Sequence, residues 1–376
     1  MYNFGLDDDQ LALRDMLRRF VDAECARDLM RAAAESEEGF ARHQWQGLGD
    51  LGVLGLAVPE THGGGGLGPV DLALAMEILG RAVVPAPVIE TLVVAGLIST
   101  AGSAAQQAAW LPRLAQGGVI ATYGVDELNG FWTPDAVTAT AEPTARGYRL
   151  SGVKTFAPYG HLADVILCAA RIPDFAGDAG VKLFLVEREQ LTVPPVLLDT
   201  LDDGYRFAEI ILDGVEVPVE ALVAGEGHGW EAWQAAGRLA AVLSAAEQLG
   251  VLERSLEMVV EYGALRTQFG KPIGSYQAMK HRCADLLIDL EASRGSVYYA
   301  AYALETGSGD VGLAVSSAKA FASDASVRGC EKALQSFGAI GFTWEHDIHF
   351  YLKRAKRLEL TLGDATFHRE LIAQSL

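Results

Sequence analysis

One candidate binding residue is an arginine that stands beside a break in a helical pattern. The stretch RTQFGKPIGSYQ begins at Arg266, and Gly270 and Pro272 interrupt the pattern shortly after it. A planar guanidinium can make two charge-assisted hydrogen bonds to a diphosphate, and it stays charged when it is partly buried. An arginine near a helix C-terminus can instead serve only to complement the helix dipole. The residues alone leave both interpretations open.

Acidic residues near the C-terminus could do acid–base chemistry. Asp364 can act as a base if burial raises its pKa toward the working pH. It also precedes the segment ATFHRELIA, so it could simply cap a helix there. Glu345, His346 and Asp347 form a second polar cluster. We interpret this cluster mainly as a surface or subunit-contact feature, with a His–Asp base as the alternative.

The elements that must carry these residues form three successive regions. Helical spacing of apolar residues covers 6–118, short β-branched runs divided by Gly, Pro and Asp cover 119–226, and helical spacing returns over 227–376. We therefore expect three domains, with the boundaries 1–118, 119–226 and 227–376. The predicted fold class is α+β, with an N-terminal helical domain, a middle antiparallel β-domain and a C-terminal four-helix bundle.

Composition excludes several functional classes. The 49 acidic residues outnumber the 30 basic ones, and the net charge of −19 argues against nucleic-acid binding, although a few local arginines leave room for an anionic cofactor. The four cysteines form no CxxC pair or metal-spaced cluster, so we expect no metal and a reduced, cytoplasmic setting. No signal-peptide pattern and no long apolar run predicting a membrane span is visible. A Rossmann fold is excluded because βαβ alternation and a GxGxxG motif after a strand are missing.

Four motifs, in the same order along the chain, resemble the acyl-CoA dehydrogenase family. They are LGVLGLAVPETHGGGGLG, LDGVEVPVEALVAGEGHGW, RTQFGKPIGSYQ and QSFGAIGFTWEHDIHFYLKRAK. The resemblance covers nearly the whole chain and implies an FAD enzyme that is usually a tetramer. In this family a carboxylate removes the α-proton of an acyl-CoA thioester, and the β-hydrogen leaves as hydride to the flavin. Electrons then pass to a separate carrier such as electron-transfer flavoprotein.

The resemblance also implies which residues contact the cofactor. The arginine matching Arg266 reaches the FAD pyrophosphate of a neighbouring subunit, and Phe269 would lie against the adenosine side. The turn from Gln335 to Gly338 would bring backbone N–H groups close to adenosine or phosphate, although Gly338 is also expected to cap a helix. The predicted cofactor-binding residues are Arg266, Gln268, Phe269, Gln277, Gln335, Ser336, Phe337 and Gly338.

The chain departs from the family where a subunit contacts its own flavin. The usual Thr-Glu-Pro stretch reads ATYGVDELNG here, and the usual aromatic-Ile-Thr/Ser step reads KTFAPYG. Phe156 can still stack, but Ala157 and Pro158 supply no hydroxyl, and Pro158 supplies no N–H either. The usual catalytic glutamate falls on Leu362, and the position of a glutamate that some members place in the long helix falls on Gly237. Both carboxylate positions are therefore empty, and Asp364, two residues past Leu362, is the nearest acid and the candidate catalytic residue.

The residues that would contact a neighbour's cofactor are kept, whereas those that would contact the chain's own flavin are altered. This contrast predicts a subunit that completes an FAD site with a partner chain. Some bacterial acyl-CoA dehydrogenases of steroid degradation are built from two unlike subunits, and the stretches GFTWEHD and LGDAT resemble such subunits. We therefore expect an acyl-CoA substrate and a homo- or hetero-tetramer with a second acyl-CoA dehydrogenase subunit. The alternatives are a self-sufficient flavoenzyme that uses Asp364 as its base, and a non-catalytic structural or assembly subunit.

Overall fold

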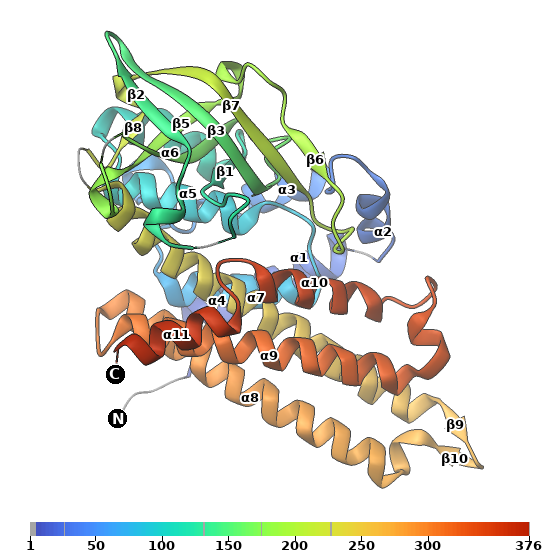
Figure 1. The fold of residues 1–376 in the computed structure, drawn as a ribbon. Coiled ribbons are helices and arrows are strands. Elements are labelled where there is room, and N and C mark those ends of the chain that lie inside the picture. Colours follow the sequence, from blue (N-terminus) through green and yellow to red (C-terminus); the bar gives the residue numbers. More distant parts are fainter. Residues whose placement is uncertain (1–4, 26, 131, 174, 226–227, 376) are drawn as a thin grey trace.

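The chain folds into helices, then a sheet, then a bundle of long helices, as the sequence predicted. In the computed structural model the sheet lies on one side of the molecule and the long C-terminal helices lie on the other (Figure 1). The predicted boundary between residues 226 and 227 falls outside the described residues. The residues that the structure describes are 5–25, 27–130, 132–173, 175–225 and 228–375.

The N-terminal region consists of helices that pack around a shared apolar core. Asp7 begins the first helix with a capping box, because its side chain accepts from the Gln10 N–H while the Gln10 side chain accepts from the Asp7 N–H. The fifth helix is buried on almost every side because it packs against the sixth and seventh helices and the first strand. The helices are α1 (Asp8–Glu24), α2 (Arg27–Glu35), α3 (Arg42–Asp50), α4 (Pro69–Arg81), α5 (Val88–Ala101) and α6 (Ala104–Ala115).

The middle region forms one sheet with the strand order β6-β7-β3-β2-β4-β5-β8, and β1 pairs with β4 beside this path. Most neighbours are antiparallel, as predicted, but β1 runs parallel to β4, and β2 meets β4 in a short parallel contact. A parallel pair is possible because the β2–β3 hairpin lies between these strands in the chain and provides the crossover. The strands are β1 (Ala121–Gly124), β2 (Thr140–Thr144), β3 (Gly147–Pro158), β4 (Val165–Arg171), β5 (Val181–Glu187), β6 (Val196–Leu198), β7 (Phe207–Pro218) and β8 (Leu222–Val223).

The C-terminal region is the predicted helical bundle. Its longest helix runs for 37 residues without a proline, and a small hairpin projects from one end of the bundle (Figure 1). Although these helices are long, no helix within the described ranges is apolar enough over its length to cross a membrane. The elements are α7 (Gly229–Leu265), β9 (Thr267–Gln268), β10 (Lys271–Pro272), α8 (Gln277–Thr306), α9 (Val311–Phe337), α10 (Ile348–Leu360) and α11 (Ala365–Ser375).

Helices α4 and α7 approach each other at backbone distance, which joins the N-terminal region to the bundle. A Cβ atom at Gly250 would lie 1.9 Å from the carbonyl oxygen of Glu77, and one at Gly80 would lie 2.3 Å from the carbonyl oxygen of Glu247. Any larger residue would force the helices apart. Gly80 therefore serves this contact, and α4 ends one residue later, at Arg81.

Candidate functional site

A cavity of about 490 Å³ opens between the sheet and the turn that joins α10 to α11. Aromatic rings form part of its wall: Tyr123 comes from β1, Phe156 from β3 and Phe207 from β7. The turn contributes Leu362 to the opposite wall. A mainly apolar cavity with a few polar groups is the usual form of a small-molecule site, so we call this space the outer cavity and treat it as the candidate site.

The backbone of β3 bends where it reaches the outer cavity. The register of the β3–β7 pairing shifts between Lys154 and Ala157, and Phe156 has a φ of 50°, which is uncommon for a residue other than glycine. Phe156 is 51% exposed, and its ring packs edge-on against Phe207, with the ring centroids 6.0 Å apart. A half-exposed ring on a strained backbone at a cavity wall is a stacking surface for a planar ligand.

Two backbone hydrogen-bond donors beside this ring are already engaged. The Thr155 N–H donates to the Asp126 carbonyl at 2.9 Å, and the Tyr159 N–H donates to the Arg206 carbonyl at 2.8 Å. Pro158, which also lines the cavity, has no N–H. On the β3 side the wall therefore offers a flavin ring a surface for stacking, while the N–H groups of Thr155 and Tyr159 are not free to bind its pyrimidine.

Two adjacent carboxyl groups at the outer cavity differ in their hydrogen-bond partners and in the direction in which their pKa is shifted. Glu127 accepts from Lys154 Nζ at 2.6 Å and from the Thr138 and Ala139 N–H groups. Burial acts to raise the pKa of Glu127, but these partners outweigh it and lower the pKa. Burial raises the pKa of Asp126 to about 6, against the opposing charge of Lys154, and its carboxyl makes no hydrogen bond within the described part of the chain. Asp126, which sequence analysis did not single out, is the carboxyl that a ligand would meet.

The turn between α10 and α11 is held by buried polar groups. Lys319 on α9 donates to the carbonyl oxygens of Leu358 at 2.9 Å and Gly363 at 3.1 Å. His368 Nε2 lies 3.0 Å from the carbonyl oxygen of Leu362, and Leu362 itself has a φ of 60° and lines the outer cavity. The position of the usual base thus faces the cavity on a well-supported turn. It carries an aliphatic side chain that cannot take a proton.

Asp364 is positioned as a helix cap. Its Oδ1 accepts from the Phe367 N–H at 2.7 Å, and its carbonyl oxygen accepts from the His368 N–H at 3.1 Å, at the start of α11. The lining of the outer cavity includes Leu362 but not Asp364. The geometry favours the capping interpretation, and the role of Asp364 as a base stays a prediction.

The polar cluster Glu345–Asp347 does not come together as one site. Asp347 is buried and pairs with Arg31 on α2 at 2.5 Å, so the surface interpretation is wrong for this residue, while a subunit contact by the cluster stays a prediction. His346 packs against the ring of Phe337, with centroids 4.1 Å apart, while Glu345 is exposed. The three side chains point into different surroundings because the chain turns here before α10 begins.

Five of the predicted cofactor-binding residues are exposed at one end of the bundle. The C-terminal ends of α7 and α9 meet there, where the rings of Tyr262 and Phe337 lie 4.8 Å apart, and the β9–β10 hairpin projects beyond them (Figure 1). The Arg266 side chain makes no hydrogen bond or ion pair with any described residue, and Phe269 is 93% exposed with a φ of 52°. The exposed residues are Arg266, Gln268, Phe269, Gln277 and Gln335.

The other three predicted residues stabilise the bundle itself. Ser336 accepts from Arg282 at 2.9 Å and donates to the Lys332 carbonyl at 2.8 Å, while Phe337 is buried. Gly338 ends α9 with a φ of 66°, which is the helix cap that the sequence predicted. A cofactor contact from this turn would have to come from the main chain and from Gln335.

Sequence analysis missed a group of buried charges where the three regions meet. Arg354 donates to Asp202 at 2.7 Å and to Glu247 at 2.6 Å, and Arg357 donates to the same two residues at 3.2 and 3.1 Å. The guanidinium of Arg357 also lies over the ring of Tyr205. We call these five residues the buried ionic layer. The run KRAKR looks like a solvated basic face, so nothing in the sequence indicated its burial.

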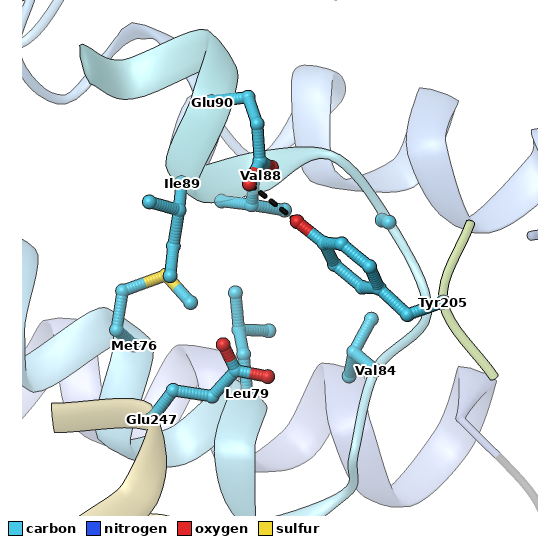
Figure 2. A pocket seen from close by; sticks show the side chains of 9 residues that line it. Met76, Leu79, Val84, Val88, Ile89, Glu90, Tyr205 and Glu247 are labelled. Carbon is cyan, nitrogen blue, oxygen red and sulfur yellow. Dashed lines mark hydrogen bonds between the residues drawn. The ribbon is translucent and has the colours of Figure 1, made fainter. Parts of the chain in front are cut away.

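Glu90 on α5 adds a sixth polar group beside this layer. Figure 2 shows the Tyr205 hydroxyl donating to its carboxyl, and Glu247 lies below on α7. Burial raises the pKa of Glu90 from 4.5 to about 7, although the bond from Tyr205 opposes the shift. A protonated Glu90 leaves two cations and two anions in the ionic layer, so the buried charges balance.

We expect Glu90→Gln to have a higher free energy of unfolding than the wild type. The difference should grow as the pH rises from about 5 to about 7 and reach on the order of 3 kcal/mol. The folded protein holds the Glu90 proton more tightly than the unfolded chain does, so wild-type stability falls over this range and stays lower above it. Glutamine does not titrate and can still accept from Tyr205. Urea unfolding across this pH range measures the difference, with the exposed Glu142→Gln on β2 as the control. A stabilisation that does not change with pH would contradict the prediction.

Comparison with known proteins finds similarity along the whole chain. The family described as "Acyl-CoA dehydrogenase, N-terminal domain" matches residues 7–118. The family described as "Acyl-CoA dehydrogenase, C-terminal domain" matches residues 227–376. Acyl-CoA dehydrogenase FadE27 of Mycobacterium tuberculosis is 32% identical over 372 residues, which cover 97% of this chain and 96% of that protein.

Solved structures share the complete fold. The ChsE4–ChsE5 complex of Mycobacterium tuberculosis has a TM-score of 0.91 at 30% identity, and the match covers 100% of this chain and 98% of that one. A variant of the Tcur3481–Tcur3483 steroid ACAD has a TM-score of 0.87 at 30% identity, with coverage of 98% and 97%. Each of these descriptions names two components together.

Proposed function

Because this chain belongs to the acyl-CoA dehydrogenase family, we propose that it is a subunit that completes an FAD site together with a partner chain. Members of this family are FAD-dependent oxidoreductases that act on CH–CH bonds. One contrast within the chain supports the partner role. Arg266 is exposed and has no ion-pair partner among the described residues, whereas the cavity position of the usual base carries Leu362.

The exposed end of the bundle fits the diphosphate and adenosine of FAD. An unpaired guanidinium at Arg266 can grip a diphosphate with two hydrogen bonds. A ring that is 93% exposed, as Phe269 is, loses contact with water favourably when another molecule covers it. We assign Arg266 to the diphosphate and Phe269 to the adenosine side of a cofactor whose remaining contacts come from the partner chain.

The outer cavity of this chain fits the flavin ring less well. It provides Phe156 for stacking, but the N–H groups of Thr155 and Tyr159 are engaged, and Ala157 and Pro158 supply no hydroxyl there. When bound, FAD supplies a hydride acceptor for the β-hydrogen of the substrate. The contribution of this chain is to bind and orient the cofactor. Leu362 cannot remove the α-proton, so we assign that step to an acid of the partner chain.

The similarity to two-subunit relatives supports a finer assignment of substrate and partners. We propose an acyl-CoA thioester with a steroid-derived acyl group, since one relative is described as a steroid ACAD. The assembly would be a tetramer with a second acyl-CoA dehydrogenase subunit, and the electron acceptor would be an electron-transfer flavoprotein or a similar carrier. A cytoplasmic location also stays a prediction.

The visible spectrum of the purified protein tests the proposal. The chain alone should be colourless, and flavin absorbance should appear when it is co-expressed with a second family member. About one flavin per chain in the protein alone would favour a self-sufficient flavoenzyme. Colourless protein with every candidate partner would favour a structural or assembly subunit.

We expect Asp364→Asn to keep most of the activity of the assembled enzyme, whereas Asp364→Ala should lower the free energy of unfolding by about 1 kcal/mol. Asparagine can still accept from the Phe367 N–H, but it cannot take a proton. Comparing the asparagine variant with the alanine variant therefore separates capping from catalysis. Steady-state rates and urea unfolding of both variants provide the measurement. A rate loss of about 10³-fold in the asparagine variant would instead identify Asp364 as the base.

A further inference from the structure

Most charged side chains in the wall of the outer cavity have a partner of opposite charge. Glu127 pairs with Lys154 at 2.6 Å, and Asp202 pairs with Arg357 at 3.2 Å within the buried ionic layer. Lys356 lies 3.4 and 3.6 Å from two glutamates, one on α9 and one on α10. Each of these charges is therefore already balanced inside the chain.

Asp126, which follows β1 by two residues, is the exception in this wall. Its carboxyl makes no hydrogen bond or ion pair with any residue that the structure describes. The charge of Lys154 acts on it, but that ammonium already donates to Glu127. Because Lys154 and Glu127 cancel, an ionised Asp126 leaves one net negative charge at this side of the cavity. A buried carboxylate without a partner is unfavourable, and a bound cation would relieve that cost.

Aromatic rings form part of the wall that contains this carboxyl. The face of an aromatic ring attracts an ammonium group that lies within about 6 Å of its centre. The same ring packs favourably against another ring in an offset or edge-on arrangement. Rings beside an unpaired carboxylate therefore favour a ligand that has both a positive charge and a ring of its own. The rings in the wall belong to Tyr123, Trp132, Phe156 and Phe207.

We propose that the outer cavity binds a ring-bearing organic amine, whose ammonium group pairs with the Asp126 carboxylate and whose ring packs among the aromatic side chains of the wall. The carboxylate selects the charge of the ligand, and the rings supply the apolar contact. This inference goes beyond the proposed function, because it uses neither FAD nor an acyl-CoA. Arg266 and Phe269, to which we assign the diphosphate and adenosine contacts, do not line the outer cavity.

Three indole compounds of similar size and different charge test this selection. Tryptamine is a cation, tryptophol is neutral and indole-3-propionate is an anion. Calorimetric titration of the flavin-free full chain at pH 8 gives the affinities. We expect tryptamine to bind roughly 10- to 100-fold more tightly than tryptophol, which is the size of effect typical of one hydrogen bond between charged groups. Indole-3-propionate should bind more weakly than either, because its carboxylate is repelled.

Replacing Asp126 should remove the selection without removing the cavity. Asparagine has nearly the same size as aspartate but no charge, so Asp126→Asn should bind tryptamine and tryptophol about equally. Its affinity for tryptophol should stay close to that of the wild type. The matched control is Asp213→Asn, which removes the same charge from an exposed position on β7 outside the cavity wall and should keep the selection.

The affinity for tryptamine should also depend on pH. Burial raises the pKa of Asp126 to about 6, against the charge of Lys154, while a primary amine stays protonated up to about pH 10. Tryptamine should therefore bind about tenfold more tightly at pH 8 than at pH 5, as Asp126 loses its proton. Glu90, which acts on Tyr123, has a pKa of about 7, so Asp126→Asn measured over the same range gives its contribution. The other charged or titratable groups facing Asp126 or the cavity are Glu127 in the same loop, Tyr123 on β1, Asp202 between β6 and β7, and Lys356 and Arg357 on α10.

Three results would overturn the inference. They are equal affinities of the wild type for tryptamine and tryptophol, a selection that survives Asp126→Asn, and no measurable binding of any of the three compounds. If Asp126→Asn does not fold, the wild-type series and its pH dependence decide the question alone. A chain that shows the selection but never acquires FAD with any partner would refute only the proposed function. A complex that takes up FAD but shows no selection would refute only this inference.

Discussion

Arg266→Ala is expected to weaken FAD binding by the assembled complex by about 100-fold. The loss of a charge-assisted contact from an interfacial guanidinium to a buried anion costs roughly 2–5 kcal/mol, and about 1.4 kcal/mol is a factor of ten. The Arg266 side chain makes no hydrogen bond or ion pair with the described residues, so its replacement breaks none within the chain. Titration of the flavin-free complex with FAD, followed by flavin fluorescence, measures the effect.

Two further variants make this prediction specific. Arg266→Lys should fall between the wild type and the alanine variant, because an ammonium keeps the charge but cannot bind a diphosphate in a bidentate manner. Arg146→Ala removes an exposed arginine from the β2–β3 turn and should leave the FAD affinity unchanged. Equal affinities of the wild type and the Arg266→Ala variant would remove the diphosphate role.

Arg354→Met should lower the free energy of unfolding by about 3–5 kcal/mol. The side chain is 1% exposed and donates to Asp202 at 2.7 Å and Glu247 at 2.6 Å. Without it, two buried carboxylates would share the single guanidinium of Arg357, and one negative charge would stay uncompensated. Urea unfolding at constant pH gives the difference in free energy.

The control for this variant is an exposed ion pair. Arg149 and Glu216 lie 3.2 Å apart on the sheet, with side chains that are 51% and 72% exposed. Arg149→Met should change the stability by no more than about 0.5 kcal/mol, because water screens such pairs. If both arginine variants lost a similar amount, burial of the ionic layer would not be the cause.

The buried ionic layer and the exposed hairpin both support the proposal that this chain is one subunit of a shared enzyme. The layer closes the outer cavity from behind, and Leu362 lines that cavity where a base would stand. Arg266, which we propose binds the cofactor diphosphate, is instead exposed where α7 joins the hairpin at the end of the bundle. This separation is why we assign binding of the cofactor to this subunit and proton removal to its partner.

Local features of the sequence were sufficient to predict the elements. The absence of proline and the spacing of apolar residues indicated the long helix that the structure places at Gly229–Leu265. The turn signal ARG lies between β2 and β3, and Gly338 ends α9, as expected. These features depend on residues a few positions apart, and backbone conformation follows from such neighbours.

Contacts between distant residues could not be predicted from the sequence. The parallel pairing of β1 with β4 was missed because short strands carry no signal for their partner. Asp126 was missed because its single useful property, an unpaired carboxyl at a cavity wall, exists only after folding. Asp202 and Arg354 are 152 positions apart, so no local pattern relates them.

By itself, the sequence determined which chemical groups this chain possesses: an arginine beside a helix break, and a leucine where the family has its base. The tertiary structure decided where those groups are placed. It exposed Arg266, directed Leu362 into a cavity and buried the KRAKR run against two acids. The physical reason is that residue identity sets charge and hydrogen-bonding capacity, whereas burial and pairing depend on residues brought together from all three regions.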